Sequence, residues 1–139
     1  MRAAFTMIEV VVVLAVLSIL AGISVPAMIG MRDRITLRLA ALETSQALTD
    51  ARSMALSAAR RTAVRMDASR NTITVYSGAD TLRTLRLNEY GVTLRTTRDS
   101  IAWGPTGIGW GASTATITLS RGSSSTALAI SRLGRIRKA

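Results

Sequence analysis

The longest run of apolar positions in this chain lies close to its N-terminal end. Val10 to Met31 is a stretch of 22 residues without a charged side chain. An α-helix of that length, at about 1.5 Å per residue, covers the roughly 30 Å hydrocarbon core of a bilayer. Glu9 is the single charge near the start of the apolar stretch, which begins at Phe5. Because an unpaired carboxylate at the edge of a membrane span is costly, we expect Glu9 to have a partner.

Two ordinary explanations exist for the apolar run. A signal anchor explains its length and hydrophobicity but gives no reason for Glu9. A cleaved signal peptide predicts a small-x-small site after the apolar core, for which Ala21-Gly22-Ile23-Ser24 is a candidate. The four residues before Phe5, Met-Arg-Ala-Ala, are too few for a conventional secretory leader. They nevertheless contain one positive charge and end in two small residues, as a processing site does.

The helical pattern continues beyond the apolar run and becomes amphipathic. Pro26 lies within this helix and is expected to kink it or to loosen one turn. Small and apolar residues then recur mostly at steps of three and four, which predicts a face suited to lying closely on a sheet. The face consists of Ile35, Leu39, Leu42, Ala47, Ala51, Met54, Ala55 and Ala58. We expect one long helix that ends near Ala59 to Arg61.

After Arg61 the apolar period changes to two, which is typical of β-strands. The predicted strands cover residues 62–66, 72–76, 81–87, 92–97, 101–103, 114–120 and 126–131. Residues 104–113, with four Gly and one Pro, form a predicted loop. Residues 121–125 join the last two strands as a candidate hairpin turn. Helix and strands together predict an α+β protein with a single modest core of about 100 residues after the membrane segment.

The composition narrows the function. The 139 residues contain no Cys and no His, which excludes a disulfide framework, a Cys/His metal site and a Cys- or His-based nucleophile. The formal net charge is +10 and the sequence pI is about 11.7, which favours a polyanionic partner such as nucleic acid, or an anionic membrane face. Arg accounts for 17 of the 18 basic residues and suits bidentate phosphate recognition, although high-GC codon usage produces the same bias. Aromatic residues are few, so stacking platforms for single-stranded nucleic acid are sparse.

Enzyme chemistry finds little support in the sequence. The eight acidic residues are scattered without a metal-ligand spacing. The stretch G-P-T-G-I-G-W-G contains a G-x-G pattern, but a predicted strand and not a helix follows it, so a dinucleotide site is not expected. We therefore expect no enzymatic activity, no cofactor, no metal and no small-molecule substrate.

The N-terminal stretch A-F-T-M-I-E-V-V-V-V-L-A-V-L-S-I-L-A, with Pro26 after it, resembles the class III leader of type IV prepilins and type II secretion pseudopilins. The resemblance implies cleavage between Ala4 and Phe5, N-methylation of the new Phe5 amine, and retention of Glu9 for assembly. Ala4 stands where that family usually has Gly, and its small side chain fits the same kind of peptidase subsite. In a filament, Glu9 would pair with the Phe5 amine of a neighbouring subunit and specify axial register more than add stability.

The segment A-R-S-M-A-L-S-A-A-R-R-T-A-V-R-M, followed by I-A-W-G-P-T-G, T-I-T-L and A-I-S-R-L-G-R-I-R, resembles the GspH/FimT family of minor pilins and pseudopilins. The resemblance implies a pilin-like fold, in which a long N-terminal helix packs on a globular part of small antiparallel sheets. It divides the chain into a leader (1–4), a transmembrane and assembly half-helix (5–31), an amphipathic half-helix (32–61) and a β-rich part (62–139). It also implies partners: a prepilin peptidase and methylase, the inner membrane before assembly with the globular part periplasmic, and then other pilins in a pilus or pseudopilus, at the cell surface in the first case.

Some FimT-like members bind DNA during natural transformation through a C-terminal G-R-x-R, and Gly134-Arg135-Ile136-Arg137 matches that motif. Lys138 follows it and Arg132 precedes it, so the predicted DNA-binding set is Arg132, Gly134, Arg135, Arg137 and Lys138. On an extended segment the two arginines of an Arg-x-Arg pair lie on one side, about 7 Å apart, near the phosphate spacing of a nucleic-acid strand.

Two interpretations of the C-terminal basic cluster are alternatives to DNA binding. One is a solvated basic tail that keeps the terminus soluble. The other belongs to a GspH-like minor pseudopilin of a type II secretion system, a structural subunit that needs no DNA contact. The FimT-like alternative predicts a minor type IV pilin that binds extracellular DNA non-specifically during competence.

Overall fold

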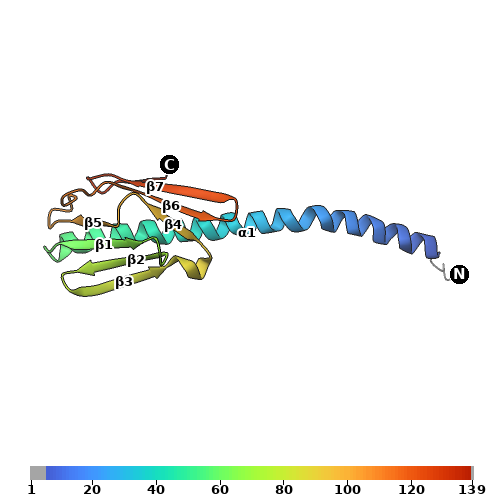
Figure 1. Cartoon of the computed structure of the whole chain (residues 1–139), viewed down its shortest axis with the longest axis horizontal. Coiled ribbons are helices and arrows are strands. Elements are labelled where there is room, and N and C mark those ends of the chain that lie inside the picture. The colour runs from blue at the N-terminus through green and yellow to red at the C-terminus, as the bar shows by residue number, and fades with distance from the viewer. Residues whose placement is uncertain (1–5, 139) are drawn as a thin grey trace. The chain divides into compact units, whose positions relative to one another are not determined.

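A computed structural model describes residues 6–138 of the chain (Figure 1). Helix α1 runs from Met7 to Ser57 and is one continuous α-helix. Two compact units divide at residue 32, so the first part of α1 (residues 7–32, the stem) and the part from Asp33 onward (the globular unit) are described separately. The helix ends slightly before the predicted boundary, and Ala59 then adopts a left-handed conformation with φ 48°.

Eight strands and one short 3-10 helix follow α1 in the globular unit. Their bounds are β1 Thr62–Asp67, β2 Thr72–Ser77, β3 Asp80–Arg86, η1 Leu87–Tyr90, β4 Thr93–Thr96, β5 Ser100–Trp103, β6 Ala115–Arg121, β7 Ser124–Ile130 and β8 Ile136–Lys138. The seven predicted strands are confirmed with small shifts at their ends. The 3-10 helix and β8 are additions that the sequence pattern did not predict.

The strands form two antiparallel four-stranded sheets. Sheet A has the order β3-β2-β1-β5, and sheet B has the order β4-β6-β7-β8. The chain changes sheets repeatedly, since β4 pairs with β6 in sheet B while β5 returns to pair with β1 in sheet A. Figure 1 shows β1, β2 and β3 of sheet A in green to yellow-green and β6 and β7 of sheet B in orange to red, both alongside the second half of α1. The α+β, pilin-like arrangement of a long helix and small antiparallel sheets is confirmed.

A single hydrophobic core joins the second half of α1 to both sheets. Alternate strand residues point into it, as the burial of Val64 and Met66 in β1 and of Ile117 and Leu119 in β6 illustrates. Trp103 at the end of β5 is 1% exposed and is the largest fully buried side chain. The helix contributes Leu37, Ala40, Ala41, Ala47, Leu48, Ala51 and Ala55. Small residues dominate this helix face because the sheets lie close to the helix backbone.

The predicted buried face of α1 is correct at Ala47, Ala51 and Ala55 and wrong at its other five positions. Ile35, Leu39, Leu42 and Met54 are 48%, 51%, 55% and 38% exposed, and Ala58 is exposed as well. The prediction linked Leu42 to Ala47, and a step of five residues rotates the direction of a side chain by about 140° around the helix axis. The apolar residues before Ala47 that are buried instead are Leu37, Ala40 and Ala41.

Polar contacts fix sheet B and the 3-10 helix to α1. The Arg121 guanidinium donates from Nε to Asp33 Oδ1 at 2.8 Å, with both side chains mostly covered. Tyr90 donates its hydroxyl proton to Glu43 Oε1 at 2.8 Å, and this hydrogen bond raises the pKa of Tyr90 above its ordinary value. The hairpin tip after β6 and the turn after β3 are therefore held on the helix at defined positions.

Candidate nucleic-acid interface and N-terminal stem

The first turn of α1 is closed by a reciprocal pair between Thr6 and Glu9. The backbone N–H of Glu9 donates to Thr6 Oγ1 at 3.3 Å, and the backbone N–H of Thr6 donates to Glu9 Oε2 at 3.4 Å. This is the capping-box arrangement, in which a Thr and a Glu three residues later satisfy each other's backbone donors. The partner expected for Glu9 is thus partly supplied within its own helix. Ala4 and Phe5, the predicted cleavage and methylation residues, lie outside the described residues.

The stem presents an almost entirely apolar surface. Its large hydrophobic side chains, from Met7 to Met31, are 49% to 87% exposed. One window within α1 reaches a mean hydropathy of 2.7 with no residue buried, so this helix is long and apolar enough to cross a membrane. Ser18 donates its hydroxyl proton to the carbonyl of Leu14 at 2.8 Å, which satisfies it without water. A surface of this kind requires lipid or neighbouring apolar helices to cover it.

At the other end of the chain, β8 places the basic residues on two opposite sides of sheet B. Ile136 and Lys138 pair with Ile130 and Leu128 of β7, both of which are buried. Directly paired residues lie on the same face of a sheet, so Ile136 and Lys138 lie on the inner side. Arg137 pairs with Ala129 and lies on the outer face. Arg135 precedes β8 and, together with Arg137, borders an open depression of about 460 Å³ on that face.

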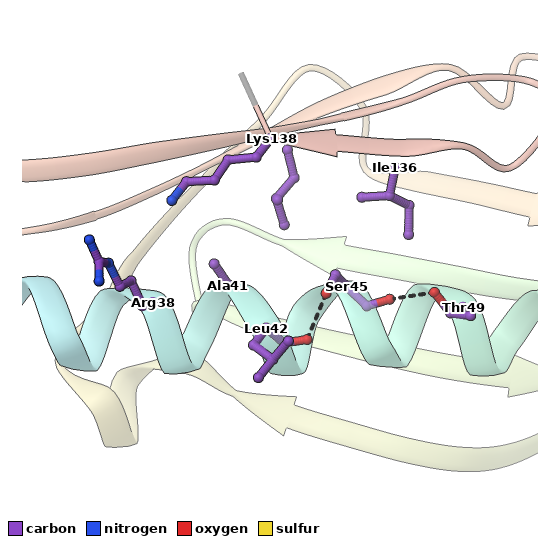
Figure 2. Close-up of a pocket in the computed structure, with 8 residues that line it drawn as sticks. Arg38, Ala41, Leu42, Ser45, Thr49, Ile136 and Lys138 are labelled. Atoms are coloured by element: carbon purple, nitrogen blue, oxygen red, sulfur yellow. Dashed lines mark hydrogen bonds between the residues drawn. The ribbon is translucent and has the colours of Figure 1, made fainter.

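Lys138 does not join this pair. Lys138 lies with Arg38 at a groove between α1 and sheet B, with apolar walls that include Leu42 and Ile136, as Figure 2 shows. Arg132 lies in the exposed turn between β7 and β8, and its carbonyl accepts a hydrogen bond from the backbone N–H of Gly109 at 2.8 Å. Of the predicted set, the structure therefore brings together Arg135 and Arg137 and separates Lys138 from them.

Gly134 has a structural role that explains its residue type. Its φ of +75° lies in the left-handed region, which favours glycine. A Cβ at this position would lie 2.6 Å from Cδ and 2.7 Å from Nε of Arg52. Arg52 in turn donates from Nε to the carbonyl of Gly107 at 2.9 Å. The Arg52 side chain thus lies between α1, the 104–113 loop and the turn that leads to Arg135, a link for which the sequence offered no signal.

The surroundings of Arg135 and Arg137 are positively charged. No Asp or Glu occurs after Asp99 in the sequence, whereas residues 100–138 contain five cationic side chains. Across the outer face of sheet B, Arg95 pairs with Thr118, and Thr118 pairs with Ala127. Arg98 donates from Nε to the carbonyl of Thr114, a residue that also borders the depression beside Arg135. On this face, arginines thus lie on both edge strands, β4 and β8, and small uncharged residues lie on the two strands between them. None of the four strands contains a carboxylate side chain.

The part of the chain that the structure describes shows no candidate metal site. Within residues 6–138, no group of three or more His, Cys, Asp or Glu side chains is placed to hold a metal ion. The eight acidic residues remain dispersed, and several are engaged in surface ion pairs or helix contacts. The features that remain for function are the apolar stem and the basic outer face.

Comparison with known proteins bears on the N-terminal stem and on the fold. Residues 1–25 match the family described as the prokaryotic N-terminal methylation motif. No curated protein sequence matches the chain significantly.

Solved structures share the fold. The type IV minor pilin FimU of Pseudomonas aeruginosa aligns with a TM-score of 0.63 at 21% identity, over 77% of this chain and 90% of FimU. A second crystal form of FimU aligns with a TM-score of 0.60 at 19% identity, over 74% of this chain and 92% of the other. The minor pseudopilin EpsH of the Vibrio cholerae Type 2 Secretion System aligns with a TM-score of 0.59 at 13% identity, over 74% of this chain and 95% of EpsH. Pilus and pseudopilus subunits, and not enzymes, are thus the proteins that this chain is similar to. The chain has an N-terminal methylation motif and the pilin-like fold that type IV minor pilins and type II minor pseudopilins share.

Proposed function

We propose that this protein is a FimT-like minor type IV pilin that binds DNA non-specifically through Arg135 and Arg137. It is stored in the inner membrane by its stem with the globular unit in the periplasm, is cleaved between Ala4 and Phe5 and methylated at Phe5, and is then built into a pilus. The observation that most supports DNA binding is the common placement of Arg135 and Arg137 on an outer sheet face without carboxylates. Phosphate oxygens are the matching ligands, since Arg presents a planar fork of donors.

The binding is expected to be electrostatic and independent of sequence. Replacing both Arg135 and Arg137 with Ala should lower the affinity for duplex DNA by roughly tenfold or more at low salt, equally for unrelated sequences. The slope of log affinity against log salt concentration should fall by about two, because two phosphate contacts are lost. A mobility-shift titration of the full chain in detergent, at several salt concentrations, measures both quantities.

A matched control uses two arginines of the sheet A side. The Arg70 and Arg86 side chains are exposed and form loose ion pairs with Asp67 and Glu89. Replacing both with Ala removes the same charge as the Arg135 and Arg137 double variant. If the two double variants lose affinity equally, net charge alone explains binding and the proposed interface is wrong.

Lys138→Ala should lower the DNA affinity less than either Arg135→Ala or Arg137→Ala, because Lys138 lies on the inner side of the sheet. The same mobility-shift titration compares the three single variants.

Assembly is proposed to depend on Glu9. Replacing Glu9 with Ala should deplete the protein from sheared fibres while the membrane pool remains, because the carboxylate would no longer pair with a neighbouring Phe5 amine. Immunoblots of the fibre and membrane fractions measure this ratio. Thr6→Ala is the matched control, since it breaks the capping box but keeps the carboxylate. Equal losses in the two variants would assign the role of Glu9 to helix capping and contradict the pairing.

A minor pseudopilin of a type II secretion system is the second candidate. The alignment with EpsH covers 95% of that chain, and this similarity in fold supports the pseudopilin candidate about as well as the similarity to FimU supports the pilin candidate. This candidate requires the stem and Glu9 but no DNA contact. Loss of protein secretion upon deletion of the gene, with DNA affinity unaffected by the Arg135 and Arg137 double variant, would support it over the first proposal.

A further inference from the structure

The loop before β6 holds a tryptophan at the surface in a fixed position. Trp110 is 59% exposed, whereas Trp103, the other tryptophan of the chain, is 1% exposed. The backbone N–H of Trp110 donates to the carbonyl of Ala102 at 2.8 Å, and its carbonyl accepts a hydrogen bond from Ser113 Oγ at 2.7 Å. The indole also rests against Gly104, where a Cβ would lie 3.1 Å from Cε3. Trp110 is therefore held from both sides of its backbone while much of its ring faces solvent.

The same loop is bonded to the basic segment. Gly109, next to Trp110, donates its N–H to the carbonyl of Arg132 at 2.8 Å. The turn that starts at Ser131 then leads to Arg135, whose N–H donates to Ser131 Oγ at 3.1 Å. Trp110 and the Arg135–Arg137 segment are thus fastened to one another through a short series of backbone contacts. Arg52 braces this arrangement through Gly107 and Gly134.

We propose that Trp110 is a stacking platform for an unpaired base of single-stranded DNA, whose phosphates are bound by Arg135 and Arg137. This inference rests on the proposed DNA-binding function and adds the form of DNA that the site prefers. An exposed indole offers stacking to any base, without sequence preference. In a duplex the bases are already stacked on each other, so only a single strand or a frayed end gains from this ring.

The charge around Trp110 favours nucleic acid over a protein partner. Protein interfaces use exposed aromatic residues as well, and two apolar residues, Ile108 in the same loop and Leu133 in the turn bonded to it, are 47% and 59% exposed. The segment bonded to this loop, however, contains Arg132, Arg135 and Arg137, and no acidic residue occurs from residue 100 to residue 138. A polyanion that also presents flat π-surfaces matches both the charge and the indole, and single-stranded DNA is such a ligand.

The test compares two DNA forms on the full chain in detergent. The probes are a 20-nucleotide oligo-dT and a blunt duplex of the same length, and the readouts are affinity and intrinsic tryptophan emission. Oligo-dT should quench the emission of the unmodified protein in a saturable way. Trp110→Ala should lower the affinity for oligo-dT by roughly 5- to 100-fold and leave the affinity for the duplex within about twofold. Trp110→Phe, which keeps an aromatic ring, should retain most of the oligo-dT affinity, and its remaining Trp103 emission should not be quenched.

Ile108→Ala is the matched control, because it removes an exposed apolar neighbour without a π-face. Equal losses of oligo-dT affinity in the Trp110→Ala and Ile108→Ala variants would indicate a general apolar contact and overturn the stacking proposal. An unchanged oligo-dT affinity in Trp110→Ala would also overturn it and leave protein docking as the role of this surface. The Arg135 and Arg137 double variant distinguishes failure of the proposed function from failure of the stacking proposal. If this variant keeps its affinity for both oligo-dT and the duplex, the proposed function itself is contradicted. If it loses affinity for both while Trp110→Ala has no effect, only the stacking is contradicted.

Discussion

Replacing Leu48 with Ala should lower the free energy of unfolding of the globular unit by about 2–5 kcal/mol. Leu48 is 0% exposed and lies on the face of α1 that packs against both sheets. Truncation would remove the transfer free energy of its side chain and leave a cavity, because the surrounding alanines are too small to fill the space. For a domain of this size, such a loss is a large share of the total stability.

The matched control is Leu42→Ala on the same helix. Leu42 is 55% exposed, so the same truncation should cost less than about 1 kcal/mol in the isolated protein. Unfolding by urea in detergent is followed in a Trp110→Phe background, in which the emission of the buried Trp103 reports on the core and not on the stem. Similar costs for both variants would show that the buried face of α1 has been assigned incorrectly.

Local periodicity predicts most elements of this fold but not the orientation of its helix. The strands of β1, β2, β6 and β7 follow from apolar residues at every second position, which a single buried face enforces. The amphipathic half of α1 is harder to orient, because leucines occur on both of its sides. Ile35, Leu39 and Leu42 are apolar yet exposed, and only the position of the sheets determines that Leu37, Ala40 and Leu48 are covered.

Features that depend on contacts between segments distant in the sequence cannot be predicted from local sequence patterns. The division of strands into sheets A and B depends on which edges meet, and β4 and β5, close in sequence, end in different sheets. β8 has three residues and only one apolar side chain, too short for a recognisable period.

The candidate site shows the same limit. The sequence identified Arg135 and Arg137 through a motif, and their extended spacing predicted that they share a side. The opposite placement of Lys138 follows from its pairing with Leu128, which no local pattern reveals. The sequence shows Trp110 only as one of the five aromatic residues of the chain, located in a glycine-rich loop. Its exposure depends on the contacts that hold that loop against β5 and the turn after β7.

Replacing Gly134 with Ala should lower the free energy of unfolding by about 2–5 kcal/mol. The left-handed backbone conformation costs an L-residue roughly 1–2 kcal/mol, and φ at this position is +75°. The new methyl group would also meet Arg52 near its Cδ and Nε atoms, where overpacking typically adds about 1–3 kcal/mol. Trp103 emission during urea unfolding, in the same Trp110→Phe background, measures the total.

Gly111→Ala separates the two contributions to the cost at Gly134. Gly111 has a similar φ of +67°, but no atom lies within 4 Å of a Cβ added there. Its replacement should therefore cost only the conformational part, about 1–2 kcal/mol. In an Arg52→Ala background, Gly134→Ala should approach the cost of Gly111→Ala, because the crowding is gone. If Gly134→Ala already equals Gly111→Ala with Arg52 present, the packing of Arg52 imposes no constraint. Backbone conformation alone would then explain the glycine that precedes Arg135, and Arg52 would have no part in positioning Arg135 and Arg137.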